Sequence, residues 1–310
     1  MTRYLLGRIA SAILVVWLVV TLTFLLMHAI PGGPFSSEKV LPPAIMDNIN
    51  QRYHLDDPLT KQYLDYLKNI AHFNFGPTFR YEGRTVNDLF REGLPKTMAL
   101  GLVATVLALV GGTILGIIAA LKQNKAPDYI ATFLATIGVS VPSFVLATFL
   151  QYYVGYKTHW FPPIGWGEAQ NIVLPALALS AYPIAQITRL TRSSMLDVLN
   201  QDFIRTAKSK GLPGYLVVMR HALKNALIPV ITFLGPFFAY IITGNFVVEF
   251  VFNIPGIGQF FVTSIGNRDY PVIMGTTILF ASLLVTFNLL VDIAYTIIDP
   301  RIKLTGRKGA

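Results

Sequence analysis

The chain has 310 residues, of which 53% are hydrophobic and 13% are charged, and its net charge at pH 7 is +9. A mean hydropathy of +0.55 is too apolar for an ordinary soluble fold, so the composition indicates a protein that crosses a membrane several times. We therefore interpret the positive charge by its position along the chain, and we expect no nucleic-acid partner. Cysteine is absent, which excludes disulfides, thiol catalysis and cysteine metal sites.

Six stretches are apolar enough and long enough to be transmembrane helices, since about 20 helical residues cross the hydrocarbon layer. The sequence therefore predicts an all-α polytopic membrane protein with six transmembrane helices. The fourth stretch is short and contains Pro175 and Pro183, so we expect it to be kinked or partly interfacial. The expected spans are residues 9–30, 97–121, 129–155, 172–188, 229–252 and 271–298.

Lysine and arginine in the short connections predict the orientation of the chain. They gather before the first span, between the second and third, after the fourth, and at the end of the chain. Both termini are therefore expected in the cytoplasm. The domains expected are residues 1–30 as the N-terminal segment and first span, 31–96 as an external cap loop, and 97–310 as the remaining transmembrane domain.

The external loop is too long to be a bare connector, and we expect it to form a small cap. Helical patterns run from Leu41 to about Tyr53 and from Leu59 to Ala71, and an aromatic passage punctuated by Gly and Pro follows. A surface for an external partner and a simple lid over the helix ends both fit this loop.

Inside the expected spans, glycines and a proline predict the packing. Gly112 and Gly116 allow close helix approach, which we interpret as packing within the chain. Pro142, followed by Ser143, lies in the middle of the third span, where it kinks a helix. Such a kink either lines a pathway or only shapes the bundle.

Ionisable residues are few at membrane depth, and each is a candidate functional residue. His28 and Glu249 are expected near the outer ends of spans, within reach of water, and Asp292 lies in the sixth span. Structural roles are favoured for these three residues. The pathway candidates retained are Pro142, Ser143, Glu249 and Asp292.

The sequence contains none of the common catalytic or nucleotide-binding motifs. No Gly-Lys dipeptide occurs, so the chain has no phosphate-binding loop for ATP. The metalloprotease, nucleophile-elbow and dinucleotide motifs are absent as well. We expect no catalysis and no cofactor bound by this chain.

The segment from Arg189 to Ile228 carries seven Lys or Arg and two Asp in an otherwise apolar chain. Its apolar residues recur at helical spacing up to Phe203, Gly211-Leu-Pro-Gly214 breaks the helix, and a second helix is expected from Tyr215 to Ala226. Two amphipathic helices with a sharp corner would suit a soluble docking partner. A basic helix pair that lies on anionic lipid is the alternative.

The 189–228 segment resembles the coupling loop of permease subunits in ATP-binding-cassette importers, whose motif is Glu-Ala-Ala, a glycine, and a later Ile-x-Leu-Pro. With Gly211 as the glycine, Arg205-Thr206-Ala207 falls on Glu-Ala-Ala, His221 on the Ile and Leu223 on the Leu. Only Ala207, Gly211 and Leu223 match that general motif, and Lys224 stands at its proline.

The departures from the motif resemble those of the peptide and nickel importer permeases, and most closely the B-type subunits of oligopeptide importers. The similarity extends over nearly the whole chain. The passages that carry it include Phe203-Ile-Arg-Thr-Ala-Lys-Ser-Lys-Gly-Leu, Arg220-His-Ala-Leu-Lys-Asn-Ala-Leu-Ile-Pro229, Pro31-Gly-Gly-Pro-Phe35, Tyr53-His-Leu-Asp-Asp-Pro58, Val141-Pro-Ser-Phe144, Pro255-Gly-Ile-Gly258 and Asn267-Arg-Asp-Tyr270.

The resemblance implies a type I importer permease fold in the cytoplasmic (inner) membrane. It implies a sister permease, two cytoplasmic ATPases that bind ATP and Mg²⁺, an external peptide-binding protein and the lipid bilayer as partners. The implied ATPase-coupling residues are Arg205, Thr206, Ala207, Gly211, Leu212, His221 and Leu223. Gly211 is expected to allow close backbone approach or a positive φ.

Two other functions remain open from the residues alone. A proton-coupled transporter or channel without ATPases would need an intramembrane proton carrier, for which Asp292 is the best candidate. A membrane scaffold would leave the 189–228 segment without a purpose. Dipeptides, oligopeptides, glutathione and nickel chelates all remain possible cargoes.

Overall fold

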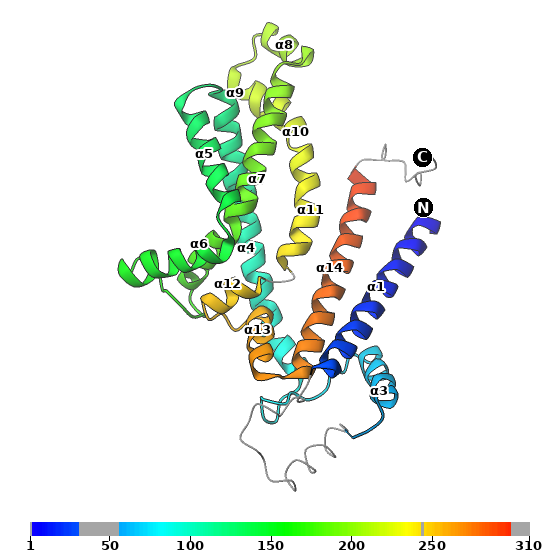
Figure 1. Cartoon of the computed structure of the whole chain (residues 1–310). Helices are drawn as coiled ribbons and strands as arrows, with labels where there is room; N and C mark the ends of the chain where they lie inside the picture. Colours follow the sequence, from blue (N-terminus) through cyan, green and yellow to red (C-terminus); the bar gives the residue numbers. More distant parts are fainter. Residues whose placement is uncertain (1, 31–55, 243–244, 299–310) are drawn as a thin grey trace. The chain divides into compact units, whose positions relative to one another are not determined.

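The structure is a computed structural model, and it describes residues 2–30, 56–242 and 245–298. Every regular element within these ranges is a helix (Figure 1). The helices are α1 (Thr2–Ala29), α3 (Leu59–Ala71), α4 (Val86–Leu121), α5 (Ala126–Ser140), α6 (Ser143–Phe149), η1 (Leu150–Lys157), η2 (Ala169–Ile172), α7 (Val173–Leu199), α8 (Asp202–Ser209), α9 (Gly214–Leu216), η3 (Val217–Ala222), α10 (Leu223–Ala226), α11 (Ile228–Ile242), α12 (Phe246–Val251), α13 (Ile257–Asn267) and α14 (Tyr270–Ile298).

The helical class expected from the sequence is confirmed. Four helices of the described residues are long and apolar enough to cross a membrane, and two bent helix pairs raise the number to six if each pair is one span. Within the long loop, α3 has the expected bounds, Leu59–Ala71. The helical pattern expected from Leu41 to Tyr53 lies outside the described residues.

The third expected span is not one helix. α5 ends at Ser140, and the continuation Ser143–Lys157 departs from its axis by 104°. Pro142 is the physical cause, because it lacks an N–H for the helix and its ψ of 140° is extended just before α6 begins. The expected kink is therefore a complete break.

The fourth and fifth expected spans also differ from the prediction. α7 is one 27-residue helix, and Pro183 is accommodated inside it. The expected fifth span, 229–252, divides into α11 and the short α12, which starts after Asn245. The Asn245 side chain accepts a hydrogen bond from the backbone N–H of Val248 at 3.1 Å, so it caps a new helix at this point.

The chain forms two compact units. Of the described residues, the first comprises those up to Pro95 and Gly256–Thr286, and the second comprises those from Lys96 to Pro255 and the end of α14 from Phe287. In the first unit, the aromatic passage after α3 packs onto α13 and the start of α14, with Phe75 and Tyr81 against one apolar cluster and Phe79 against another.

Asp269 joins this aromatic passage to the turn between α13 and α14. Its carboxylate accepts hydrogen bonds from the backbone N–H groups of Phe79 at 3.1 Å and Arg80 at 3.3 Å. Burial raises the pKa of the Asp269 carboxyl above its ordinary value, although these N–H donors oppose that shift. The loop after α3 is thus held by a buried polar contact as well as by apolar packing.

In the second unit, α7 packs closely against α4 and α5 at glycines. A Cβ atom on Gly112 would lie 2.7 Å from the Cβ of Ile187, and one on Gly116 would lie 2.5 Å from the Cβ of Thr191. A Cβ on Gly138 of α5 would lie 2.8 Å from the carbonyl oxygen of Ala181. The expected role of Gly112 and Gly116 in packing within the chain is confirmed.

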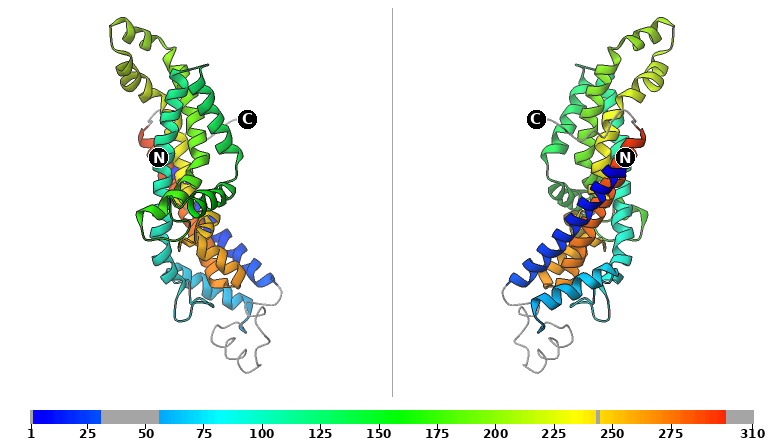
Figure 2. Two further views of the ribbon diagram at one scale, coloured as in Figure 1. Left: turned by 90° about the vertical axis from the view of Figure 1, so that its left-hand side faces the viewer. Right: turned by 90° about the vertical axis from the view of Figure 1, so that its right-hand side faces the viewer.

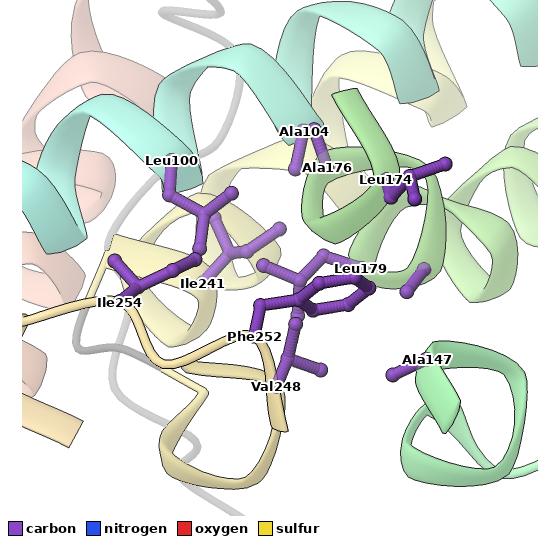
Figure 3. Close-up of a cluster of buried hydrophobic side chains, with 11 residues drawn as sticks. Leu100, Ala104, Ala147, Leu174, Ala176, Leu179, Ile241, Val248, Phe252 and Ile254 are labelled. Carbon is purple, nitrogen blue, oxygen red and sulfur yellow. The ribbon is translucent and has the colours of Figure 1, made fainter. Parts of the chain in front are cut away.

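The main apolar core of the second unit lies where α4, α6, α7, α11 and α12 meet. Figure 3 shows the ring of Phe252 beside Leu179 and Val248, with Leu100 and Ile254 close to Ile241. Ala104 and Ala176 allow α4 and α7 to approach each other in the same cluster. The core thus holds the N-terminal end of α7 against α6 and α12, the short helices that follow the breaks in the third and fifth expected spans.

Adjacent glycines of α4 provide a matched test of this packing. We expect Gly112→Ala to destabilise the protein by about 1–3 kcal/mol, because the added methyl group meets Ile187 and the Ile184 carbonyl oxygen. Gly111→Ala is the control, since its Cβ would have only ordinary contacts, at 3.8 Å. Thermal unfolding in detergent measures both variants, and equal melting temperatures would contradict the close contact.

Candidate functional site

The 189–228 segment forms the two helices and the corner expected from the sequence. α8 spans Asp202–Ser209, and a continuous helical stretch made of α9, η3 and α10 runs from Gly214 to Ala226. Figures 1 and 2 show that α8 and the turn after it project beyond the turn between α4 and α5. α8 and the turn after it are therefore accessible to a partner at this end of the second unit.

Gly211 makes the corner between the two helices. Its φ is +77°, so the expected positive φ is confirmed, and a Cβ there would meet nothing within 4 Å. The Gly211 N–H donates to the carbonyl oxygen of Lys208 at 3.0 Å, and the Leu212 N–H donates to that of Ala207 at 3.4 Å. This pair of bonds is a Schellman ending, and Pro213 then starts the next helix.

One face of α8 is buried against the rest of the segment. Ile204 and Ala207 pack with Met195 of α7, with Ala120 of α4 and with the second helix, where Val217, Ala222 and Ala226 contribute. Ala207 is only 6% exposed. It is therefore not available for direct contact with a partner, and its proposed role in coupling can only be to seat α8.

The opposite face of the segment combines exposed apolar and basic side chains. Phe203, Leu212, Tyr215 and Met219 are all exposed, although each is apolar or aromatic. Arg205 has only a weak ion pair, 3.6 Å from the carboxylate of Asp202, and both side chains face solvent. Exposed cations near these apolar side chains are Lys208, Lys210, Arg220 and Lys224.

The structure separates the expected coupling residues by exposure. Arg205, Thr206, Gly211 and Leu212 lie on the exposed side around the corner. His221 and Leu223 are half-buried on the second helix, on either side of the buried Ala222. Sequence reasoning did not select Phe203, Tyr215 and Met219. Their signal was an apolar residue at a solvent-facing position of a basic amphipathic helix.

A cavity of about 400 Å³ lies beside the break between α5 and α6. Among the described residues that line it, none carries a charged side chain, and polar groups come from Ser143, Asn245 and two tyrosines. Pro142 and Ser143 are thus placed at a cavity as expected for pathway candidates. The lining comprises Val139, Val141, Pro142, Ser143, Leu179, Tyr182, Pro183, Phe237, Tyr240, Ile241 and Asn245.

Glu249 does not line this cavity. Glu249 is fully buried, at 0% exposure, so the expectation that water reaches it is wrong. The physical reason is that α12 is a separate short helix packed against α6 and α7, and not the end of a straight span. Asp292 lies within α14, and its side chain lies outside the described residues.

Two family descriptions match the chain. The family described as binding-protein-dependent transport system inner membrane component matches residues 112–304, and the description of the N-terminal part of such membrane components matches residues 1–100.

Characterised relatives match over the full length. The chain is 48% identical over 309 residues to the dipeptide transport system permease protein DppB of Bacillus subtilis, covering 100% of both chains. It is 46% identical over 305 residues to the oligopeptide transport system permease protein OppB of Escherichia coli K12, covering 98% of this chain and 100% of the relative.

Two solved structures are similar in fold. An inward-facing structure of the MetNI methionine ABC transporter matches with a TM-score of 0.54 and 20% identity, over 68% of this chain and 94% of that chain. An amino acid ABC transporter with histidines matches with a TM-score of 0.51 and 15% identity, over 70% of this chain and 95% of that chain. At these identities the match concerns the fold alone.

Neighbouring residues of α8 test how this helix is seated. We expect Ala207→Glu to detach α8, because it places a carboxylate among buried apolar side chains without a partner. Trypsin cleavage at Lys208 and Lys210 in native membranes should then accelerate at least tenfold, as local opening exposes the backbone. Thr206→Glu is the matched control on the exposed side and should cleave at the parent rate. Equal cleavage of both variants would contradict the buried position of Ala207.

Proposed function

Because the chain belongs to the family of binding-protein-dependent transport system inner membrane components, we propose that it forms half of the translocation pathway of an ATP-driven peptide importer. The chain is a non-catalytic permease subunit of the membrane, and proteins of this family work with ATPase subunits and a binding protein. The assembly we propose contains this chain, one sister permease, two cytoplasmic ATPases that bind ATP and Mg²⁺, and one external peptide-binding protein.

Peptides are the proposed cargo, and the full-length similarity to a dipeptide and an oligopeptide permease carries this proposal. The uncharged cavity is consistent with it. Peptides of different sequence share only their backbone and termini, and the hydroxyls of Ser143, Tyr182 and Tyr240 can exchange hydrogen bonds with backbone amides. Selection between peptides would then fall to the external binding protein.

The exposed side of the 189–228 segment is the proposed docking surface for one ATPase. Docking surfaces use aromatic and arginine anchors surrounded by polar groups, and Phe203, Tyr215 and Arg205 have this character. A purely lipid-bound helix pair would not need the corner at Gly211, which turns the chain sharply at an exposed point. In the proposed orientation this segment and both termini face the cytoplasm, and the loop 31–96 faces outward.

ATP can move the permease only if the ATPases hold the segment differently in two states. Closure of the ATPase pair on ATP would displace α8 and, through the cluster around Met195, the end of α7. α7 continues to Tyr182 and Pro183 at the cavity. The proposed cycle therefore opens the cavity outward with ATP bound and inward after hydrolysis.

The alternative of a proton-coupled transporter is not retained. The family to which the chain belongs depends on binding proteins, and its full-length relatives are dipeptide and oligopeptide transport permeases. A proton carrier at Asp292 is therefore not part of the proposed mechanism.

Affinity purification from gently solubilised membranes tests the docking surface. We expect Leu212→Asp and Tyr215→Asp each to reduce the recovery of the ATPases at least tenfold, because a charge replaces an exposed apolar contact. Asn225→Asp is the control, since it adds the same charge at an exposed position near the end of the second helix. Full ATPase recovery with both variants would refute this docking surface.

Reconstituted transport tests the cargo. The purified assembly in proteoliposomes, supplied with its binding protein, should hydrolyse ATP faster when dipeptides or oligopeptides are present and should accumulate labelled peptide. Glutathione and a nickel chelate serve as the competing cargoes. Stimulation by one of these compounds, and none by peptides, would overturn the peptide assignment and leave the importer assignment in place.

A further inference from the structure

A bidentate ion pair of the second unit joins α5 to α7, and its arginine lies in the part of the 189–228 segment that belongs to α7. Nε of Arg192 donates to Oδ1 of Asp128 at 2.6 Å, and Nη2 donates to Oδ2 at 2.8 Å. The Asp128 side chain is 3% exposed, and that of Arg192 is 30% exposed. A bidentate contact of this kind sets both distance and orientation, because the planar guanidinium matches the carboxylate.

Asp128 also organises the turn that leads into α5. Its Oδ2 accepts the backbone N–H of Asn124 at 2.9 Å, and its Oδ1 accepts the hydroxyl of Thr132 at 3.4 Å. Asn124 has a φ of +59°, so this turn is held in a conformation that few residues adopt. The carboxylate therefore connects the turn, the first part of α5 and α7 at one point.

Arg192 occupies a position in α7 where several contacts converge. The preceding residue, Thr191, lies against Gly116 of α4. Met195, one turn further along, is completely buried against Ile204 and Ala207 of α8. The ion pair thus lies within one turn of the place where α8 is seated on α7.

The two helices that the ion pair joins reach the same cavity at their other ends. α5 extends for 15 residues, about 22 Å at helical rise, and Val139 near its end lines the cavity. α7 contributes Leu179, Tyr182 and Pro183 to the same lining. Close to that end, Gly138 lies against Ala181 and Ala185. Each end of the pair of helices therefore has its own tight contact.

We propose that the Asp128–Arg192 ion pair makes α5 follow α7 when α8 moves, and so couples ATP use to the opening of the cavity. Without the pair, α7 receives the displacement directly through Met195, while α5 follows only through its apolar packing and the longer contact of Arg189 with Thr136. The two cavity walls then move independently, and ATP is hydrolysed without productive opening. Asp128 and Arg192 are positioning residues in this mechanism, and the inference rests on the proposed importer function.

Two measurements on the complete reconstituted importer test this inference. Asp128→Asn preserves the shape of the side chain and removes its charge, and we expect peptide uptake per ATP hydrolysed to fall about fivefold or more. ATP hydrolysis itself should stay within about twofold of the parent. Glu168→Gln is the matched control, because it replaces an exposed carboxylate of the second unit by an amide far from the 189–228 segment, and it should leave the ratio unchanged.

Spin labels report the movement directly, and the natural absence of cysteine allows them to be placed at chosen sites. Tyr129→Cys on α5 and Ser193→Cys on α7 are exposed positions beside the two partners. In the parent, the distance between the labels should not change with nucleotide. With Asp128→Asn it should broaden and become dependent on nucleotide.

The outcomes separate the two levels of the proposal. A normal uptake ratio in Asp128→Asn, or a parent distance that changes with nucleotide, would overturn the role of the ion pair. Absence of ATP-dependent uptake in the parent assembly would instead overturn the proposed function. If Asp128→Asn does not assemble, Arg192→Lys replaces it, since Lys keeps the charge but loses the bidentate contact, and the same ratio and distance decide the result.

Discussion

Close approach of α7 to its two neighbouring helices is the constraint on which the second unit depends. Gly112 and Gly116 on α4 and Gly138 on α5 leave room only for hydrogen at the points of contact. In a membrane, helices gain little by hiding apolar side chains from lipid, so close packing of small residues has to supply much of the association. α8 packs on α7, and α7 also supplies one wall of the cavity. The positions of α8 and of that wall therefore both depend on how closely α7 packs against α4 and α5.

Packing alone would not set the rotation of one helix about another, and polar contacts add that information. The bidentate contact of Arg192 with Asp128 has a defined direction, unlike the contact of an apolar side chain. In the first unit, Asp269 performs a comparable task, since its carboxylate binds two successive backbone N–H groups. In both units a buried carboxylate holds a turn against a long helix.

The sequence predicted those features that depend on local chemistry. Apolar length indicated the helices, the Leu59–Ala71 pattern indicated α3 with its bounds, and Gly211 was expected to adopt a positive φ. Pro142 indicated a kink, but its size could not be read from the residue, because tertiary contacts decide whether a helix bends or starts again. The division of the fifth span at Asn245 had a similar origin, since a capping side chain only acts once the chain has turned.

Burial of single residues was the least predictable feature of the candidate site. Glu249 was expected near water because its span was drawn as a straight helix, and the separate α12 places it in the interior instead. Ala207 matches the coupling motif, yet its side chain lies on the buried face of α8, while Phe203 and Leu212 are exposed. The pairing of Asp128 with Arg192 was equally hidden, because 64 positions of sequence separate the two residues.

In the proposed importer, the uncharged wall of the cavity would decide how long a peptide stays there. A charged side chain in such a place would hold peptides of opposite charge and repel others, whereas hydroxyl and amide groups bind every backbone weakly. A transport pathway has to bind its substrate well enough to admit it and weakly enough to release it within one cycle. Short residence with little preference for sequence is therefore the expected property of this wall, and throughput would be set by the rate of conformational change.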